Sequence, residues 1–104
     1  MKMNQEQFKV AMENGDKPLV AVFSAAWCGP CKMFSPVLDK AGDELGGKYN
    51  FAKVDVDESP KLAAEYEVMT VPTIVVIKGG AVVAKKSGAF PNVALLGKWI
   101  EGVL

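Results

Sequence analysis

The sequence predicts an α/β protein with a central mixed sheet of four to five strands, flanked by helices on both faces in three layers. Three observations predict it. Strand-like and helix-like segments alternate over residues 19–66, the order of a βαβ unit, which requires parallel strands. The first of these strands is apolar at every position, as a strand buried on both faces must be. The last two strand-like segments flank a Gly-Gly pair suited to a tight hairpin, so they should run antiparallel.

Length and charge restrict the class of protein. At 104 residues, half of them hydrophobic, the chain is predicted to be one domain over residues 1–104, and we expect a monomer. Twelve Lys and Arg balance twelve Asp and Glu, so bulk charge attracts it neither to nucleic acid nor to lipid headgroups. The amino end lacks the apolar stretch of a secretory signal, and the longest apolar run is half of a membrane span. We therefore expect no nucleic-acid or membrane partner and a cytoplasmic location.

A helix is predicted to open the chain. Asn4 is a suitable N-cap, and the helix should run to about Asn14, where Gly15 ends it. The turn at residues 15–18 then leads into the strand at residues 19–23, five apolar residues in a row that predict the centre of the sheet.

The middle of the chain predicts a helix, a strand and a shorter helix. The first helix covers residues 30–45 and ends at Gly46-Gly47, and Pro36 inside it lacks a backbone donor and should kink it. The strand covers residues 49–56. The short helix, over residues 59–66, begins with a serine N-cap and a proline at the first helical position.

Two strands and a helix are predicted for the last third. The strands cover residues 73–78 and 81–86 on either side of the Gly79-Gly80 turn. The helix begins near Pro91-Asn92. Its apolar positions recur at helical spacing and should pack on the sheet: Val93, Leu96, Ile100 and Val103.

The two cysteines, Cys28 and Cys31, lie where the first strand gives way to the second helix. Thiols at this spacing can close a disulfide by a rotation of one side chain. The unpaired N–H groups and the dipole of a helix N-terminus favour an anion, which lowers the pKa of a thiol held there. Cys28, nearer the helix end, is predicted to be the exposed nucleophile, and Cys31, one turn further in, the more buried resolving thiol.

Two other interpretations of the pair remain. A structural disulfide that closes so short a loop would contribute only about 2 kcal/mol, and the cytosol would keep it reduced. A zinc site needs four ligands, and two cysteines without any histidine could supply one only if two chains shared it. We expect no metal and no bound cofactor.

Further residues extend the pattern around the cysteines. The segment Trp27-Cys28-Gly29-Pro30-Cys31-Lys32, Pro36 in the helix and Val71-Pro72-Thr73 about forty residues on together resemble the active-site motifs of the thioredoxin family, and the resemblance covers nearly the whole chain. It implies the thioredoxin fold and a protein-disulfide reductase whose redox group is the Cys28–Cys31 disulfide. Its implied partners are thioredoxin reductase, which recharges it with electrons from NADPH, and disulfide-containing client proteins, in general redox homeostasis.

The resemblance also implies roles for single residues beside the supporting Gly29-Pro30 pair. Pro72, if cis, would lie against the cysteines and leave the backbone of Val71 free to pair with an extended substrate, whereas a trans turn proline is the alternative. Trp27, Val71, Gly88 and Ala89 would form an apolar collar around the nucleophile. Core packing is the alternative for Trp27, disfavoured because it follows the strand instead of lying within it.

The sequence departs from the family pattern in two places. Val22 stands where most thioredoxins have a buried aspartate, which accepts the proton as the resolving thiol attacks. Without that carboxylate Cys31 would be deprotonated through water or without assistance. Lys53, the aspartate's partner in the family, should extend to solvent, pair with another carboxylate or titrate low, and a plain solvent-facing lysine is the alternative. Only Met1 to Met3 remain of the family's first edge strand, which is therefore expected to be vestigial.

Three classes of function fit these residues. The Gly-Pro dipeptide between the cysteines resembles that of reductases and favours a reducing dithiol enzyme. The absence of the aspartate leaves open a specialised oxidoreductase with a narrow client or an isomerase-like potential. A binding module that docks a partner without turnover is the third class, and the intact cysteine pair argues against it.

Overall fold

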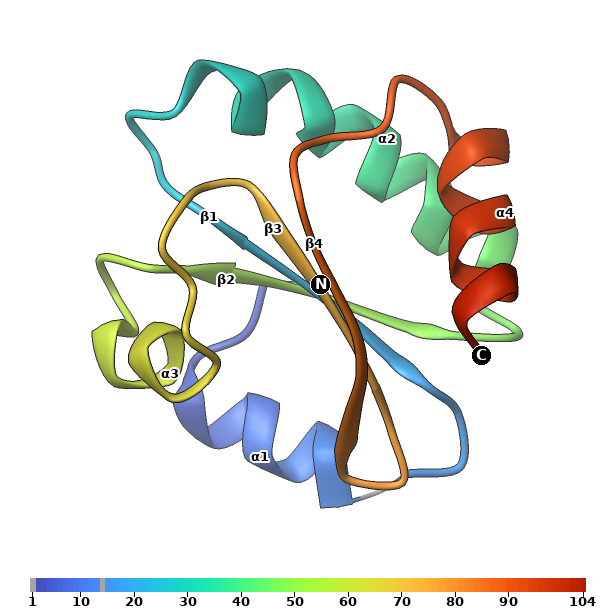
Figure 1. The fold of residues 1–104 in the computed structure, drawn as a ribbon, viewed down its shortest axis with the longest axis horizontal. Coiled ribbons are helices and arrows are strands. Elements are labelled where there is room, and N and C mark those ends of the chain that lie inside the picture. The colour runs from blue at the N-terminus through green and yellow to red at the C-terminus, as the bar shows by residue number, and fades with distance from the viewer. Residues whose placement is uncertain (1, 14) are drawn as a thin grey trace.

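The computed structural model describes residues 2–13 and 15–104. Every predicted helix and strand is present in that part of the chain, with small shifts at the ends, and the predicted helix end at Asn14 lies outside the described residues. The elements follow in the order α1 (Gln5–Glu13), β1 (Leu19–Ser24), α2 (Gly29–Leu45), β2 (Asn50–Asp55), α3 (Pro60–Glu65), β3 (Thr73–Lys78), β4 (Ala81–Ser87) and α4 (Val93–Val103) (Figure 1).

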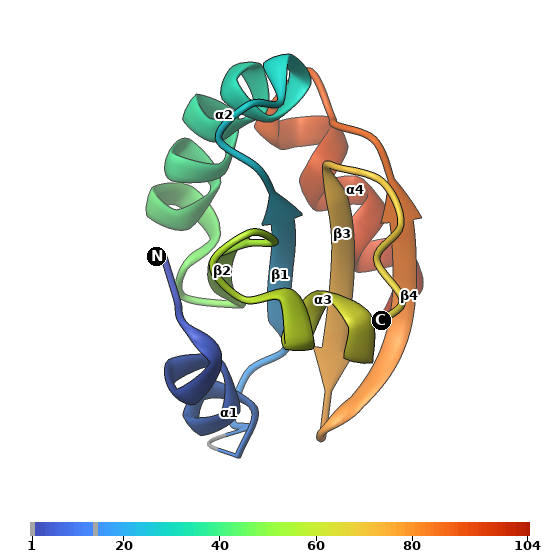
Figure 2. The same ribbon diagram turned by 90° about the vertical axis from the view of Figure 1, so that its left-hand side faces the viewer.

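The sheet is mixed, as predicted, and its strand order is β2-β1-β3-β4. β1 runs parallel to β2, and β3 runs antiparallel to both β1 and β4. Helices α2 and α4 cover one face of the sheet and α1 and α3 the other, so the molecule has three layers (Figure 1). In the view turned by 90°, α3 lies in front of the strands and α4 behind them (Figure 2). Because β1 and β2 are parallel, their carboxyl ends meet at one edge, where α2 begins.

The two central strands are buried on both faces, which explains their continuous apolar sequence. Alternate residues of β1 and β3 point into separate cores. The core under α2 and α4 contains Val20, Val22, Ile74 and Val76 with Phe34, Leu38, Leu96 and Ile100. The core under α1 and α3 contains Leu19, Ala21, Phe23, Val75 and Ile77 with Phe8 and Leu62.

Polar side chains define the start of two helices. The Asn4 side chain accepts the N–H of Gln7 at 2.9 Å, and the Gln7 side chain accepts the N–H of Asn4 at 3.0 Å, so the predicted N-cap of α1 is confirmed. Asn92 caps α4 in the same way, at 2.9 Å. Ser59 is the N-cap residue of α3, but its side chain makes no capping hydrogen bond. Pro60, which has no N–H to satisfy, is therefore the residue that favours a helix start there.

The hairpin between β3 and β4 forms as the Gly-Gly pair predicts. Gly79 and Gly80 have φ values of 60° and 79°, the left-handed region that favours glycine. Two such residues in succession match the twist of the flanking strands in a two-residue turn. Any side chain at either position would strain this turn.

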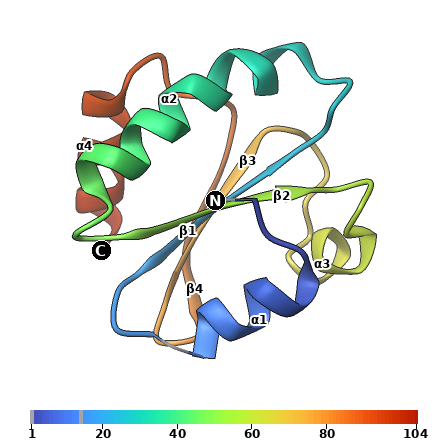
Figure 3. The same ribbon diagram turned by 180° about the vertical axis from the view of Figure 1, so that it is seen from behind.

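The first described residues of the chain lie beside the outer strand β2. Lys2 forms an isolated parallel bridge with Lys53, and the N–H of Met3 donates to the carbonyl of Lys53 at 2.8 Å, beside β2 (Figure 3). Lys2 and Met3 thus contact β2 through this bridge and this hydrogen bond, and Met1, the first residue of the expected vestigial strand, lies outside the described residues. Within residues 2–13 and 15–104, no helix combines the length and the apolar composition needed to cross a membrane.

The stability of the α1–α3 layer should depend on pH through Tyr66. The ring of Tyr66 packs against that of Phe8 at 5.5 Å between centroids, and its hydroxyl lies 2.9 Å from the sulfur of Met12. Burial, and secondly the charge of Glu65, raises the pKa of Tyr66. The folded state therefore holds the phenol proton more tightly than the unfolded state does, and this stabilisation is lost as pH rises above the unfolded pKa.

We expect the free energy of unfolding to fall more steeply between about pH 9 and 11 in the wild type than in Tyr66→Phe, because the unfolded phenol titrates near pH 10. Urea unfolding across this range measures the difference. If the free energy of unfolding changes with pH in the same way in both proteins, Tyr66 has the same pKa in the folded and the unfolded state, and the prediction is wrong.

Candidate functional site

The two cysteines lie at the N-terminus of α2, at the carboxyl edge of the parallel strands. Cys28 is the N-cap residue and Cys31 lies in the first turn, and the two form a disulfide with 5.2 Å between their Cα atoms. The N–H of Cys31 donates to the sulfur of Cys28 at 3.2 Å. The predicted position of Cys28 at the helix end is therefore correct, and the donor that faces its sulfur would favour the thiolate after reduction.

The expected difference in exposure between the cysteines is wrong for the disulfide form. Cys28 is 5% exposed and Cys31 7% exposed, so the first is no more accessible than the second. The cause is a small apolar cluster in which both cysteines pack with Ala25, Val56 and Val71. Position along the helix predicts exposure to solvent only where no other segment covers the helix end, and here the segment before β3 covers it.

The segment before β3 contacts the cysteine pair through its backbone. The Val71–Pro72 peptide bond is cis, the isomer that the sequence left open. The carbonyl oxygen of Val71 lies 3.8 Å from the sulfur of Cys28. The carbonyl of Pro72 accepts the N–H of Gly88 at 2.8 Å, which holds the loop after β4 against this segment.

Trp27 lies on the surface beside the cysteines, so the alternative of core packing is wrong. Its side chain is 71% exposed, and its indole N–H donates to a carboxylate oxygen of Asp57 at 2.9 Å. The sequence reasoning missed Asp57. Asp57 lies just after β2, at the edge where the ends of parallel strands meet, and that position was the signal that could have found it.

Lys53 pairs with a carboxylate on α2, one of the outcomes expected for it. Its ammonium nitrogen lies 2.7 Å from Oδ1 of Asp39 and 2.8 Å from Oγ of Ser35. The neighbouring position in β1 is Val22, which is 1% exposed in the core under α2. The sequence reasoning missed Ser35 and Asp39, although their spacing of four residues places them on one face of a helix.

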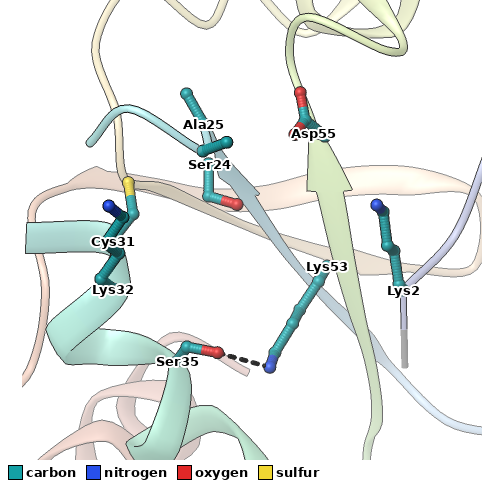
Figure 4. Close-up of a pocket in the computed structure, with 9 residues that line it drawn as sticks. Lys2, Ser24, Ala25, Cys31, Lys32, Ser35, Lys53 and Asp55 are labelled. Atoms are coloured by element: carbon teal, nitrogen blue, oxygen red, sulfur yellow. Dashed lines mark hydrogen bonds between the residues drawn. The ribbon is translucent and has the colours of Figure 1, made fainter. Parts of the chain in front are cut away.

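A cavity of about 220 Å³ borders the resolving cysteine. Cys31 lies on one wall, and Lys53, bonded to Ser35, extends along another (Figure 4). Its lining is mixed apolar and polar: Lys2, Ser24, Ala25, Ala26, Cys31, Lys32, Ser35, Lys53 and Asp55. The cavity can hold water beside Cys31, since polar groups line it. No group of three or more His, Cys, Asp or Glu side chains that could hold a metal occurs among the described residues.

Comparison with known proteins gives the same result by sequence and by structure. The family model described as Thioredoxin matches residues 1–101. The thioredoxin of Haemophilus influenzae is 41% identical over 93 residues, which cover 89% of this chain and 87% of that protein. The thioredoxin of Bacillus subtilis is 45% identical over 83 residues, 80% of each chain. The crystal structure of chloroplastic thioredoxin z superposes with a TM-score of 0.86 at 31% identity, covering 98% of this chain and 91% of that one.

The agreement extends from the fold to the chemistry of the site. The architecture is the thioredoxin fold, and the relatives named as thioredoxins match the chain across the segment that carries its cysteine pair. The protein is a dithiol-disulfide oxidoreductase whose redox group is its own Cys28–Cys31 disulfide in place of a bound cofactor. The chain belongs to the thioredoxin family.

Proposed function

We propose that this protein is a general protein-disulfide reductase, in which Cys28 is the nucleophile and Cys31 the resolving thiol. It acts as a monomeric single domain over residues 1–104 in the cytoplasm, where thioredoxin reductase recharges it with electrons from NADPH. The observation that carries the proposal is the 3.2 Å contact between the N–H of Cys31 and the sulfur of Cys28. This donor stabilises a negative charge on Cys28 and leaves Cys31 as the second thiol.

The reaction transfers two electrons in two exchange steps. The Cys28 thiolate attacks one sulfur of the client disulfide, the client S–S bond breaks, and the leaving client thiolate takes a proton from water. Cys31 then gives its proton to water and attacks the sulfur of Cys28. The mixed disulfide breaks, the second client thiol is released, and the Cys28–Cys31 disulfide remains.

The client segment is proposed to bind in extended form against the backbone of Val71, beside Pro72. The exposed ring of Trp27 is proposed to contribute to the apolar collar around Cys28 that receives this segment. Gly88, whose N–H is bonded to the carbonyl of Pro72, and Ala89 are proposed to complete the collar, since their small size would admit a polypeptide chain closely. Because main-chain hydrogen bonds give most of the affinity in this mode, recognition is largely independent of client sequence.

Water in the cavity beside Cys31 is the proposed acceptor of its proton. Val22, which stands where most relatives have a carboxylate, cannot accept a proton. Ser24 and Asp55 line the cavity, and the carboxylate of Asp55 already accepts the N–H groups of Asp57 at 2.8 Å and Glu58 at 3.2 Å. Polar lining of this kind orders water next to the thiol.

Coupled oxidation of NADPH tests the proposal. With thioredoxin reductase and insulin as the disulfide substrate, we expect NADPH oxidation in proportion to the amount of this protein, and none when the reductase is omitted. A reduction potential well below the value of about −180 mV typical of disulfide isomerases is the second expected result. Absence of NADPH oxidation, or a potential at or above that value, would contradict the assignment as a reductase.

A docking module without turnover is distinguished by replacing both Cys28 and Cys31 with serine. A reductase loses its effect on insulin in this double variant. Docking, by contrast, needs only the apolar surface around the pair, so it would survive the replacement.

A further inference from the structure

The side chain of Lys53 connects the sheet to helix α2 at two points. Its ammonium donates to Ser35 at 2.8 Å and to Asp39 at 2.7 Å. The lysine side chain is 21% exposed, whereas that of Asp39 is 64% exposed. The lysine side chain is thus mostly buried, and its ammonium is held at the edge of the core by these two acceptors.

The two acceptors lie on either side of Pro36. A proline inside a helix has no N–H for the carbonyl four residues earlier, here that of Lys32. The backbone ladder of α2 is therefore interrupted just after the turn that carries Cys31. Ser35 precedes the interruption and Asp39 follows it, so the ammonium bridges the interruption from outside the helix.

The surroundings of Lys53 favour its bonds to α2 over a bond to a residue on β1. Its neighbour across the parallel pair is Val22, which offers no acceptor. Its backbone is fixed by β2 and by the hydrogen bond from Met3 at 2.8 Å. The ammonium also borders the cavity that Cys31 lines, so the position of this side chain and the space beside the resolving thiol are linked.

We propose that Lys53 is a positioning residue for the resolving step: by bonding to Ser35 and Asp39 across Pro36, it holds the first turns of α2 so that Cys31 can attack the sulfur of Cys28. This inference rests on the proposed roles of the two cysteines. It concerns the second exchange only. Attack by Cys28 on a client needs no movement of Cys31 and is independent of the connection.

A stopped-flow reaction with 5,5′-dithiobis(2-nitrobenzoate) separates the two steps, because each releases one coloured thiolate. Lys53→Met keeps the aliphatic stem and removes the charge. We expect this variant to make the first release at the wild-type rate and the second release on the order of tenfold more slowly, because a small misplacement of reacting groups can slow a reaction by up to about a hundredfold. Asp39→Asn should slow the second release in the same direction by a smaller factor. Lys53→Arg should restore most of the rate, because a guanidinium can donate to both acceptors.

Lys40→Met is the matched control, since Lys40 is an exposed lysine on the same helix. It should leave both releases unchanged. Wild-type rates for both releases in Lys53→Met would overturn the inference. Equal slowing of both would overturn it too, because a general loss of structure acts on both steps, and far-ultraviolet circular dichroism identifies that case. If the wild type does not release the first coloured thiolate by attack of Cys28 on the reagent, the proposed function itself is overturned.

Discussion

Replacing Cys28 by serine should abolish disulfide reduction, with NADPH oxidation in the coupled insulin assay reduced by a factor on the order of 10³ or more, as when the nucleophile of other enzymes is removed. A serine hydroxyl is not ionised near neutral pH and forms no disulfide, so neither exchange step can begin. The backbone N–H that faces the sulfur of Cys28 then has only an uncharged acceptor. The fold should be retained, because the substitution exchanges one small atom at a helix N-cap, a position that favours serine.

Cys31→Ser is the matched variant that assigns the two roles. It should retain the first exchange and lose the second, so a client remains attached to Cys28 as a mixed disulfide. Non-reducing electrophoresis and mass spectrometry of the adduct measure this. Capture of the client by Cys28→Ser, with none by Cys31→Ser, would mean that the nucleophile and the resolving thiol are the reverse of those proposed.

Local signals in the sequence were sufficient for most of the fold. Side-chain caps such as Asn4 and Asn92 act within three residues of their own position, and the Gly79-Gly80 turn depends only on the φ values that glycine permits. The continuous apolar sequence of β1 follows from burial on both faces. Such signals depend on residues close together in the chain, and the sequence displays them directly.

The features that sequence reasoning missed depend on contacts between distant segments. Cys28 is covered by Val71, 43 residues away, so its low exposure could not be inferred from its place at a helix end. Asp57, 30 residues from Trp27, meets it only because β1 and β2 are parallel. The sequence contains several carboxylates that could pair with Lys53, and it is the position of β2 under α2 that brings Lys53 to Asp39.

Replacing Val22 by aspartate should destabilise the oxidised protein by about 3–5 kcal/mol at neutral pH, the usual cost of a buried charge without a partner. Val22 is 1% exposed in a core with Phe34 and Leu38. Lys53, its neighbour in register, is already bonded to Asp39. Val22→Asn is the matched control, because it introduces a polar side chain of the same shape without a charge.

The loss of stability in Val22→Asp should depend on pH. Burial raises the pKa of the introduced carboxyl, so the folded state binds its proton more tightly than the unfolded state, where the carboxyl titrates near pH 3.9. The variant is therefore least destabilised below this pH, and its free energy of unfolding falls relative to wild type as pH rises through the folded pKa. Denaturant unfolding from about pH 3.5 to 8 measures this, and Val22→Asn should show no such trend.

The same substitution should accelerate the resolving step, because in the thioredoxin family the carboxylate at this position accepts the proton of the resolving thiol. We expect the mixed disulfide to be released faster in stopped-flow reduction of a protein disulfide. A rate equal to that of the wild type over pH 6 to 9, roughly the window in which such thiols titrate, would contradict this prediction.

Combining Val22→Asp with Asp39→Ala removes the carboxylate to which Lys53 is bonded and frees Lys53 to pair with the new carboxylate. The double variant should therefore lose less free energy of unfolding than the two single variants lose together. A loss equal to that sum would show that Lys53 does not pair with the new carboxylate.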